Sequence, residues 1–433
     1  MHFLWSLFFC LPYISLIAVI LTSWLHLEEK ERRAVSILTL CALLLHIVYV
    51  FLVHRMPVLK QGRFFFIDEY SYDRFSWAIA REWRSGNFPN LWTDQYLGTL
   101  HTGWNRIVAA VYYVSGHHPN IVIALNVMAG TLFVPLAFLT GRELFRTSDQ
   151  ESLKTDKEII RKPAFIAALI SAVHFSFAYW SSFLLRDIIL AILFLAALYL
   201  ILKLFEKWRF LQATALIFIL LGLAILRVYS VAFLIAGPVV YLLSVHRKRK
   251  FAWFGLITAV FLVLAGRIFV PVRDYQDQII YTFLNNLPGA SKSPLGSLFS
   301  FLKGIPRFFL APYAWYVSPG HPVIDYMLYP GMWIWYMIIL PFSGKGLWIC
   351  MKENRVKATL AVIPVMLSVF LFLLAYGGSV PRQRLFLEPL FIVFAAYGLS
   401  KKKSSNLLVW LWYIFLFFFI IAHSISAWQR GLW

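Results

Sequence analysis

Two adjacent carboxylates, Asp68 and Glu69, are the first residues of the sequence whose types and spacing could do chemistry. They stand in the run FFFIDEYSYDRF, between an apolar stretch and an amphipathic one. A carboxylate held beside a reacting hydroxyl can act as a general base. The same pair also suits the start of a helix, because Asp is a favoured N-cap and Glu in the first turn complements the helix dipole. Their spacing is compatible with both roles.

A second charged pair, Arg186 and Asp187, lies between two apolar runs in WSSFLLRDIILAILF. A charged pair at a tight helical connection can be a solvated turn. Charged groups flanked so closely by apolar sequence also tend to face a bundle interior or a water-filled cavity. We keep both interpretations.

Three further arginines occupy comparable positions: Arg227 in LAILRVYS, and Arg382 and Arg384 in GGSVPRQRLFLEPLF. A guanidinium matches the geometry of a phosphate with paired hydrogen bonds. Arg227 could instead snorkel to the membrane surface. The other two could anchor a helix end, or form a structural pair with Glu388. Carboxylates and arginines together suit a substrate that carries a phosphate and a lipid tail.

The composition requires lipid around the elements that position these residues. The chain has 433 residues, of which 61% are hydrophobic and 14% are charged, whereas a soluble domain carries roughly 25% charged residues. The net charge is +20. Because the bases sit between apolar runs, we assign them to membrane orientation and anionic lipid rather than to nucleic acid. Cys10, Cys41 and Cys350 have neither disulfide nor metal-site spacing, so we expect no metal.

Apolar runs of the length needed to cross a bilayer predict an all-α integral membrane protein with about twelve transmembrane helices. We read residues 3–24 as a retained helix rather than a signal peptide. The predicted spans are 3–24, 34–53, 119–140, 164–184, 188–203, 211–226, 229–245, 252–270, 328–349, 358–376, 385–399 and 407–424.

Alternate loops differ in basic residues, and cytoplasmic loops are the richer ones in membrane proteins. The short loops dense in Lys and Arg are 25–33, 141–162, 203–210, 246–250, 345–357 and 401–403. We predict that they are cytoplasmic and that both termini lie on the other side. Residues 1–433 then form one polytopic domain, whose active-site face consists of the long outer loops 54–118 and 271–327.

The first outer loop contains an amphipathic stretch over residues 70–84. Tyr72, Phe75, Ile79 and Trp83 fall on one helical face, which predicts a helix in the interface plane. All the charged candidates fall on this same side of the membrane. We therefore expect the carboxylates and arginines to share one pocket at the non-cytoplasmic rim.

The order of these motifs resembles the GT-C glycosyltransferases, above all glycosyltransferase family 39, which includes protein O-mannosyltransferases and lipid A aminoarabinose transferases. The likeness rests on DEYSYDRFSWAIAREWRSGNFP, GRELF at 141–145, Arg186-Asp187, and the arginine-rich entry to a helix that ends AAYGL at 395–399. Two features depart from the family pattern. A helix at 3–24 precedes the usual first helix, and the acidic pair lies farther from the membrane exit.

The resemblance implies a polyprenyl-phosphate-sugar donor and one inverting displacement onto a saccharide, lipid or protein acceptor. Asp68 would be the catalytic base, with Glu69 orienting it or secondary to it. Asp187 would bind the acceptor or position an arginine. The candidate ligands of the leaving phosphate are Arg186, Arg227, Arg382 and Arg384. We expect no cofactor. We also expect the enzyme to lie in the plasma membrane, with its active site on the extracytoplasmic side.

Two other functions stay open. A lipid-linked polysaccharide polymerase or ligase also uses such donors at the outer face, and relies on arginines more than on an early acidic pair. A transporter or flippase of lipid-linked sugars would place polar residues at mid-membrane, often in broken helices or repeats.

Overall fold

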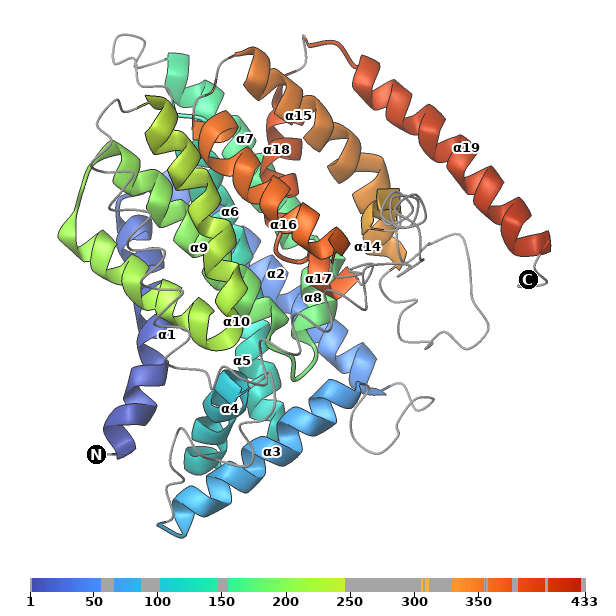
Figure 1. Cartoon of the computed structure of the whole chain (residues 1–433). Coiled ribbons are helices and arrows are strands. Elements are labelled where there is room, and N and C mark those ends of the chain that lie inside the picture. The colour runs from blue at the N-terminus through green and yellow to red at the C-terminus, as the bar shows by residue number, and fades with distance from the viewer. Residues whose placement is uncertain are drawn as a thin grey trace, which may run out of the picture.

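The structure is a computed structural model in which every described residue is helical or lies in a turn or connecting segment (Figure 1). It describes residues 2–55, 66–86, 102–146, 155–245, 305–306, 308–310, 329–353, 355, 357–375, 381–401 and 404–429. The helices pack into one bundle, with α3 and α4 projecting at one end.

The bundle is organised around α9 (Asp187–Glu206), in which every residue from Asp187 to Leu202 is buried. A helix that is hydrophobic all round has to lie in an interior. At about 1.5 Å per residue, its 20 residues extend about 30 Å, which is the thickness of a bilayer hydrocarbon core. The two ends of α9 therefore mark two poles of the molecule.

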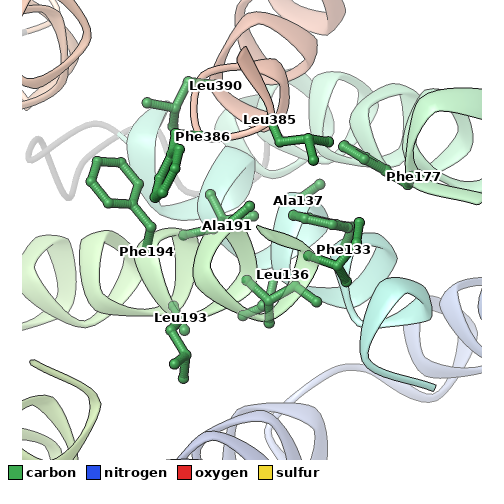
Figure 2. Packing of buried hydrophobic residues seen from close by; sticks show 14 of the residues in the cluster. Phe133, Leu136, Ala137, Phe177, Ala191, Leu193, Phe194, Leu385, Phe386 and Leu390 are labelled. Atoms are coloured by element: carbon green, nitrogen blue, oxygen red, sulfur yellow. The ribbon is translucent and has the colours of Figure 1, made fainter. Parts of the chain in front are cut away.

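The core beside α9 is packed by aromatic contacts from several helices (Figure 2). Phe194 meets Phe386 edge to face with ring centroids 5.6 Å apart. Phe133 and Phe177 stack at 3.9 Å. These pairs join α9, α6 (Phe133–Leu144), α8 (Phe175–Ser181) and the turn before α18 (Glu388–Ser400). Phe194 of α9 is thus packed against a segment distant in sequence.

The remaining helices surround this core or extend it. They are α1 (His2–Leu25), α2 (Glu29–Arg55), α5 (Pro119–Thr131), α7 (Thr155–Ala172), α10 (Phe210–Val245), α14 (Tyr329–Ile334), η5 (Trp335–Ile339), α15 (Leu340–Lys352), η6 (Lys357–Val362), α16 (Ile363–Ala375), α17 (Pro381–Arg384) and α19 (Leu407–Gln429). Phe417 and Phe418 of α19 are exposed, as are Leu44 and Phe51 of α2. In a membrane protein such apolar faces meet lipid.

The amphipathic helix expected over 70–84 is confirmed as α3 (Ile67–Arg84), which packs against α4 (Thr102–Ser115). Tyr72 and Ile79 of the predicted apolar face are buried. Arg84 joins the two helices through hydrogen bonds from Nη2 to the carbonyl oxygens of Tyr112, at 2.8 Å, and Tyr113, at 3.0 Å.

Six helical segments in the described part of the chain are long and apolar enough to cross a membrane, or seven if the α7–α8 pair, bent by 46°, is one span. Each predicted apolar run other than 252–270 coincides with a described helix or helix pair. The run 252–270 lies outside the described residues. The structure thus supports an all-helical, multi-pass protein, and the count of about twelve spans stays a prediction.

Charged side chains collect at both poles of α9. At its C-terminal end, Glu143 pairs with Lys203 at 2.9 Å and with Lys357 at 3.1 Å. Arg142 pairs with Glu31 there at 3.1 Å. These residues come from the base-dense loops that the sequence assigns to one side of the membrane, so the fold brings those loops to a common end.

Helices α15 and α18 pack closely, with glycines of each helix against the backbone of the other. A Cβ at Gly346 would overlap the carbonyl oxygen of Phe394, and one at Gly398 would overlap that of Phe342. Small residues let membrane helices approach closely enough for dense van der Waals contact. Gly344, on the same helix, has open space around it.

This difference predicts opposite results for two substitutions on α15. Gly346→Ala should lower the stability of the purified protein by about 1–3 kcal/mol, because the helices must separate to admit the methyl group. Gly344→Ala should leave the melting temperature unchanged or raise it slightly, since Ala favours helix over Gly. Thermal unfolding in detergent measures both, and equal melting temperatures for the two variants would contradict the proposed packing.

Candidate active site

The site begins at a break in α10. Arg227 has extended backbone angles, φ −161° and ψ 96°, inside this otherwise helical segment. The first half of α10 therefore ends at Leu226 and leaves a carbonyl oxygen without an intrahelical donor. Nη1 of Arg186 donates a hydrogen bond to that oxygen at 2.9 Å. Arg186 thus stabilises the broken helix end.

The N-terminus of α9 presents the next charged group, Asp187, whose side chain is 1% exposed. A helix N-terminus favours a carboxylate because the peptide dipoles point their positive end there. Oδ2 of Asp187 pairs with Nε of Arg382 at 3.1 Å, and Oδ1 lies 3.8 Å from Nη2 of Arg227. Two arginines from different parts of the chain therefore compensate one buried charge.

Arg382, in the short helix α17, links this buried carboxylate to the surface. Its Nη1 donates to Oδ2 of Asp68 at 2.7 Å. The side chain of Asp68 is 36% exposed, against 17% for Arg382. Burial lowers the pKa of Arg382, but the carboxylates of Asp187 and Asp68 outweigh burial and hold this pKa above its ordinary value. The guanidinium stays charged.

Tyr72 lies one helical turn after Asp68 and is 1% exposed. Burial raises the pKa of its phenol; Asp187 and Asp68 raise this pKa further, whereas Arg186 and Arg382 lower it. The sequence assigned Tyr72 only to the apolar face of α3. Its spacing from Asp68 is the signal that could have placed it beside the charged cluster.

The two acidic neighbours have different surroundings. Glu69 is 1% exposed. Its Oε2 accepts the N–H of Phe66 at 3.1 Å, and its Oε1 accepts the N–H of Leu184 at 2.8 Å. The N-cap of α3 is Phe66, so the N-cap interpretation of Asp68 is wrong, and Glu69 supplies the acceptor that stabilises the helix start.

Arg384 belongs to a second, buried cluster. Its Nε pairs with Oε1 of Glu388 at 3.0 Å, and Glu388 also contacts His174 at 3.1 Å. Its Nη1 donates to the carbonyl oxygen of Phe308 at 3.0 Å, and its guanidinium lies over the Trp335 ring at 4.7 Å. The structural pair with Glu388 that the sequence left open is therefore present. The role of Arg384 as a substrate ligand stays a prediction.

Asp73 is a further buried acid of α3. Tyr112 donates its hydroxyl to Oδ1 of Asp73 at 2.5 Å, and Nε2 of His117 lies 2.9 Å from the same oxygen. Trp77 stacks on the His117 ring at 4.8 Å. This cluster ties α3 to the end of α4. Within the described residues, no group of three or more His, Cys, Asp or Glu is arranged to hold a metal ion.

The arrangement can bind an anion and accept a proton at adjacent positions. The carboxylates of Asp68 and Asp187 are joined by Arg382, and Arg227 contacts the deeper one. A guanidinium between an exposed and a buried carboxylate can receive a phosphate from the exposed side. The expected juxtaposition of Asp68, Asp187, Arg227 and Arg382 is therefore observed, with Arg186 next to Asp187 in the chain.

A multi-pass helical bundle with a carboxylate–arginine cluster at one end is compatible with a membrane-embedded enzyme. Residues 154–272, just over a quarter of the chain, match the family model for dolichyl-phosphate-mannose-protein mannosyltransferases. Over these residues the chain matches that family, and the match indicates a glycosyltransferase that uses a polyprenyl-phosphate sugar donor. The resemblance drawn from the sequence is confirmed for this segment. No curated protein gives a significant match to the chain.

The matched segment contains part of the site. Arg186, Asp187 and Arg227 lie within it, whereas Asp68 and Arg382 lie outside. The contacts across this boundary, from Arg382 to Asp187 and to Asp68, connect the family segment to the rest of the cluster.

The different contacts of the two acids predict different stabilities for their amide variants. Glu69→Gln should lower the stability of the purified protein by about 1–3 kcal/mol, because one of two buried N–H groups loses its acceptor. Asp68→Asn should have a smaller effect, since Asp68 is partly exposed to solvent and Arg382 keeps Asp187 as a partner. Melting temperatures of the two variants measure this, and a larger loss for Asp68→Asn would contradict the assigned contacts.

Proposed function

We propose that this protein transfers a sugar from a polyprenyl-phosphate-linked donor to an acceptor hydroxyl at the non-cytoplasmic face of the plasma membrane, by one inverting displacement. The observation that carries the proposal is the line of contacts from half-exposed Asp68 through Arg382 to buried Asp187. The opposite pole of α9 gathers the base-dense loops, which supports a non-cytoplasmic position for this end.

Asp68 is the base in this mechanism. An inverting displacement needs a single carboxylate to take the proton of the attacking hydroxyl. The acceptor oxygen attacks the anomeric carbon, its proton moves to Asp68, and the bond from that carbon to the phosphate oxygen breaks. Of the two acids, Asp68 has the exposed side chain, while both oxygens of Glu69 accept backbone N–H groups. We assign Glu69 to positioning.

Arg382 and Arg227 bind the leaving phosphate. Negative charge grows on the lipid phosphate as the glycosidic bond breaks, and fixed guanidinium donors stabilise it. Removing one such donor costs about 10²–10³ in rate in comparable sites. The incoming phosphate competes with Asp68 for Arg382. Binding of the donor therefore releases the carboxylate that has to act as the base.

The remaining substrate assignments rest on the surroundings of the site. The lipid tail lies against the apolar outer surface of the bundle, among membrane lipids. The acceptor is a saccharide, a lipid or a protein. The outer loop 271–327 that we expect to help recognise it lies almost wholly outside the described residues.

Asp68→Asn should abolish sugar transfer while the protein remains folded, because an amide cannot take the acceptor proton at neutral pH. The measurement is transfer from a radiolabelled polyprenyl-phosphate sugar by purified protein in lipid nanodiscs. Glu82→Gln also replaces a carboxylate with an amide, but near the other end of α3. It is the matched control and should retain activity. Near-normal turnover by Asp68→Asn would remove Asp68 from the role of base.

Parallel variants separate the alternative functions. Loss of activity in Arg382→Gln with full activity in Asp68→Asn would favour a polymerase or ligase. Movement of a lipid-linked sugar from one leaflet of a vesicle membrane to the other, without transfer of the sugar to an acceptor, would favour a flippase. The proposed mechanism requires both Asp68 and Arg382.

A further inference from the structure

The turn over residues 182–185 connects α8 to α9 and leads directly into Arg186 and Asp187. All four of its residues are buried. Backbone N–H and C=O groups that are buried outside regular structure need partners, since an unpaired group costs about as much free energy as a lost hydrogen bond. The partners of this turn therefore determine where the first residues of α9 lie.

Three side chains from three different helices supply those partners. Nδ2 of Asn126, in α5, donates to the carbonyl oxygens of Phe183 and Leu185 at 2.7 and 2.8 Å. Oε1 of Glu69, in α3, accepts the N–H of Leu184 at 2.8 Å. Nε2 of His54, in α2, lies 3.1 Å from the carbonyl oxygen of Ser182.

Asn126 makes the most specific of these contacts. It is completely buried, within the apolar run NIVIALNV. A buried amide in a membrane helix is costly unless its hydrogen bonds are made. Both of its hydrogen bonds to the turn come from Nδ2, and the two carbonyls that receive them flank Leu184.

The position of the turn reaches the charged site through Asp187. Leu185 precedes Asp187 by two residues. Loss of the hydrogen bonds from Asn126 would therefore move the turn and, with it, the start of α9. The carboxylate of Asp187 holds Nε of Arg382 at 3.1 Å and faces Nη2 of Arg227. These arginines are the proposed phosphate ligands, and small displacements of such groups weaken binding and slow reaction.

We propose that Asn126 is a positioning residue for sugar transfer, which sets Asp187 and thereby preforms the arginine site for the donor phosphate. The inference rests on the proposed function, because it assumes that Arg382 and Arg227 bind the phosphate. It extends the site to a neutral side chain in the membrane-embedded part of the bundle.

A double-mutant cycle tests the inference with farnesyl phosphate as the probe. Its Kd is measured by calorimetry in detergent for the wild type, Asn126→Asp, Asp187→Asn and the double variant. A carboxylate at position 126 would point oxygens at two carbonyl oxygens, so Asn126→Asp should weaken binding about tenfold. Because Asn126 acts through Asp187, it should add less than about twofold in the Asp187→Asn background.

The pH dependence supplies a second readout. Burial raises the pKa of an introduced carboxyl, and its protonated form can again donate a hydrogen bond. The ratio of the Asn126→Asp Kd to the wild-type Kd should therefore shrink between about pH 8 and about pH 6. Asn126→Leu should show no such recovery. Thr131→Val removes a local hydrogen bond of the same helix, from Oγ1 to the carbonyl oxygen of Met128, and should bind normally.

Each result decides a different question. Failure of the wild type to bind farnesyl phosphate would overturn the proposed function. Normal binding by Asn126→Asp, or the same loss in both backgrounds, would overturn the role of Asn126 alone. If thermal unfolding shows that Asn126→Asp is misfolded, Asn126→Ser replaces it in the cycle, since its hydroxyl can still donate to one carbonyl.

Discussion

The buried charge of Asp187 at the start of α9 is the constraint on which the site depends. A carboxylate that is 1% exposed is tolerated only where opposite charge and hydrogen-bond donors compensate its lost hydration. Compensation comes from Arg382 and from Arg227, which belong to separate helices. One buried charge thus determines where α17 and the break in α10 must lie, and both segments bring an arginine to the same place.

The bilayer supplies the second constraint, through the length of α9. At about 1.5 Å per residue, about 24 Å of buried helix separates Asp187 from Lys203, which pairs with Glu143 at the other end. Charged groups are excluded from the hydrocarbon between them, so they gather at the two poles. At one pole Lys203 and Lys357 neutralise Glu143. At the other pole, Arg382 links the buried carboxylate of Asp187 to the half-exposed carboxylate of Asp68. The proposed chemistry takes place at that pole.

The sequence predicted the elements and the main juxtaposition, because both follow from periodicity and from the side of the membrane on which a loop falls. The amphipathic face of α3 and the meeting of Asp68 with Arg382 are examples. The different contacts of Asp68 and Glu69 could not be predicted, since only the tertiary structure reveals that Glu69 accepts the N–H of Leu184. The hydrogen bonds of Asn126 to the turn before α9, and that of Arg384 to the carbonyl oxygen of Phe308, depend in the same way on segments distant in sequence.

Charge balance connects the geometry to the order of events in the proposed reaction. Among the described residues around Asp187, the three carboxylates of Asp68, Glu69 and Asp187 are balanced in number by the three guanidiniums of Arg186, Arg227 and Arg382. A phosphate adds negative charge to this neutral set, so one carboxylate has to give up its arginine. Asp187 is too deeply buried to be rehydrated, whereas Asp68 can turn to water. In the proposed reaction, donor binding is therefore coupled to release of Asp68, which stays paired with Arg382 when no donor is bound.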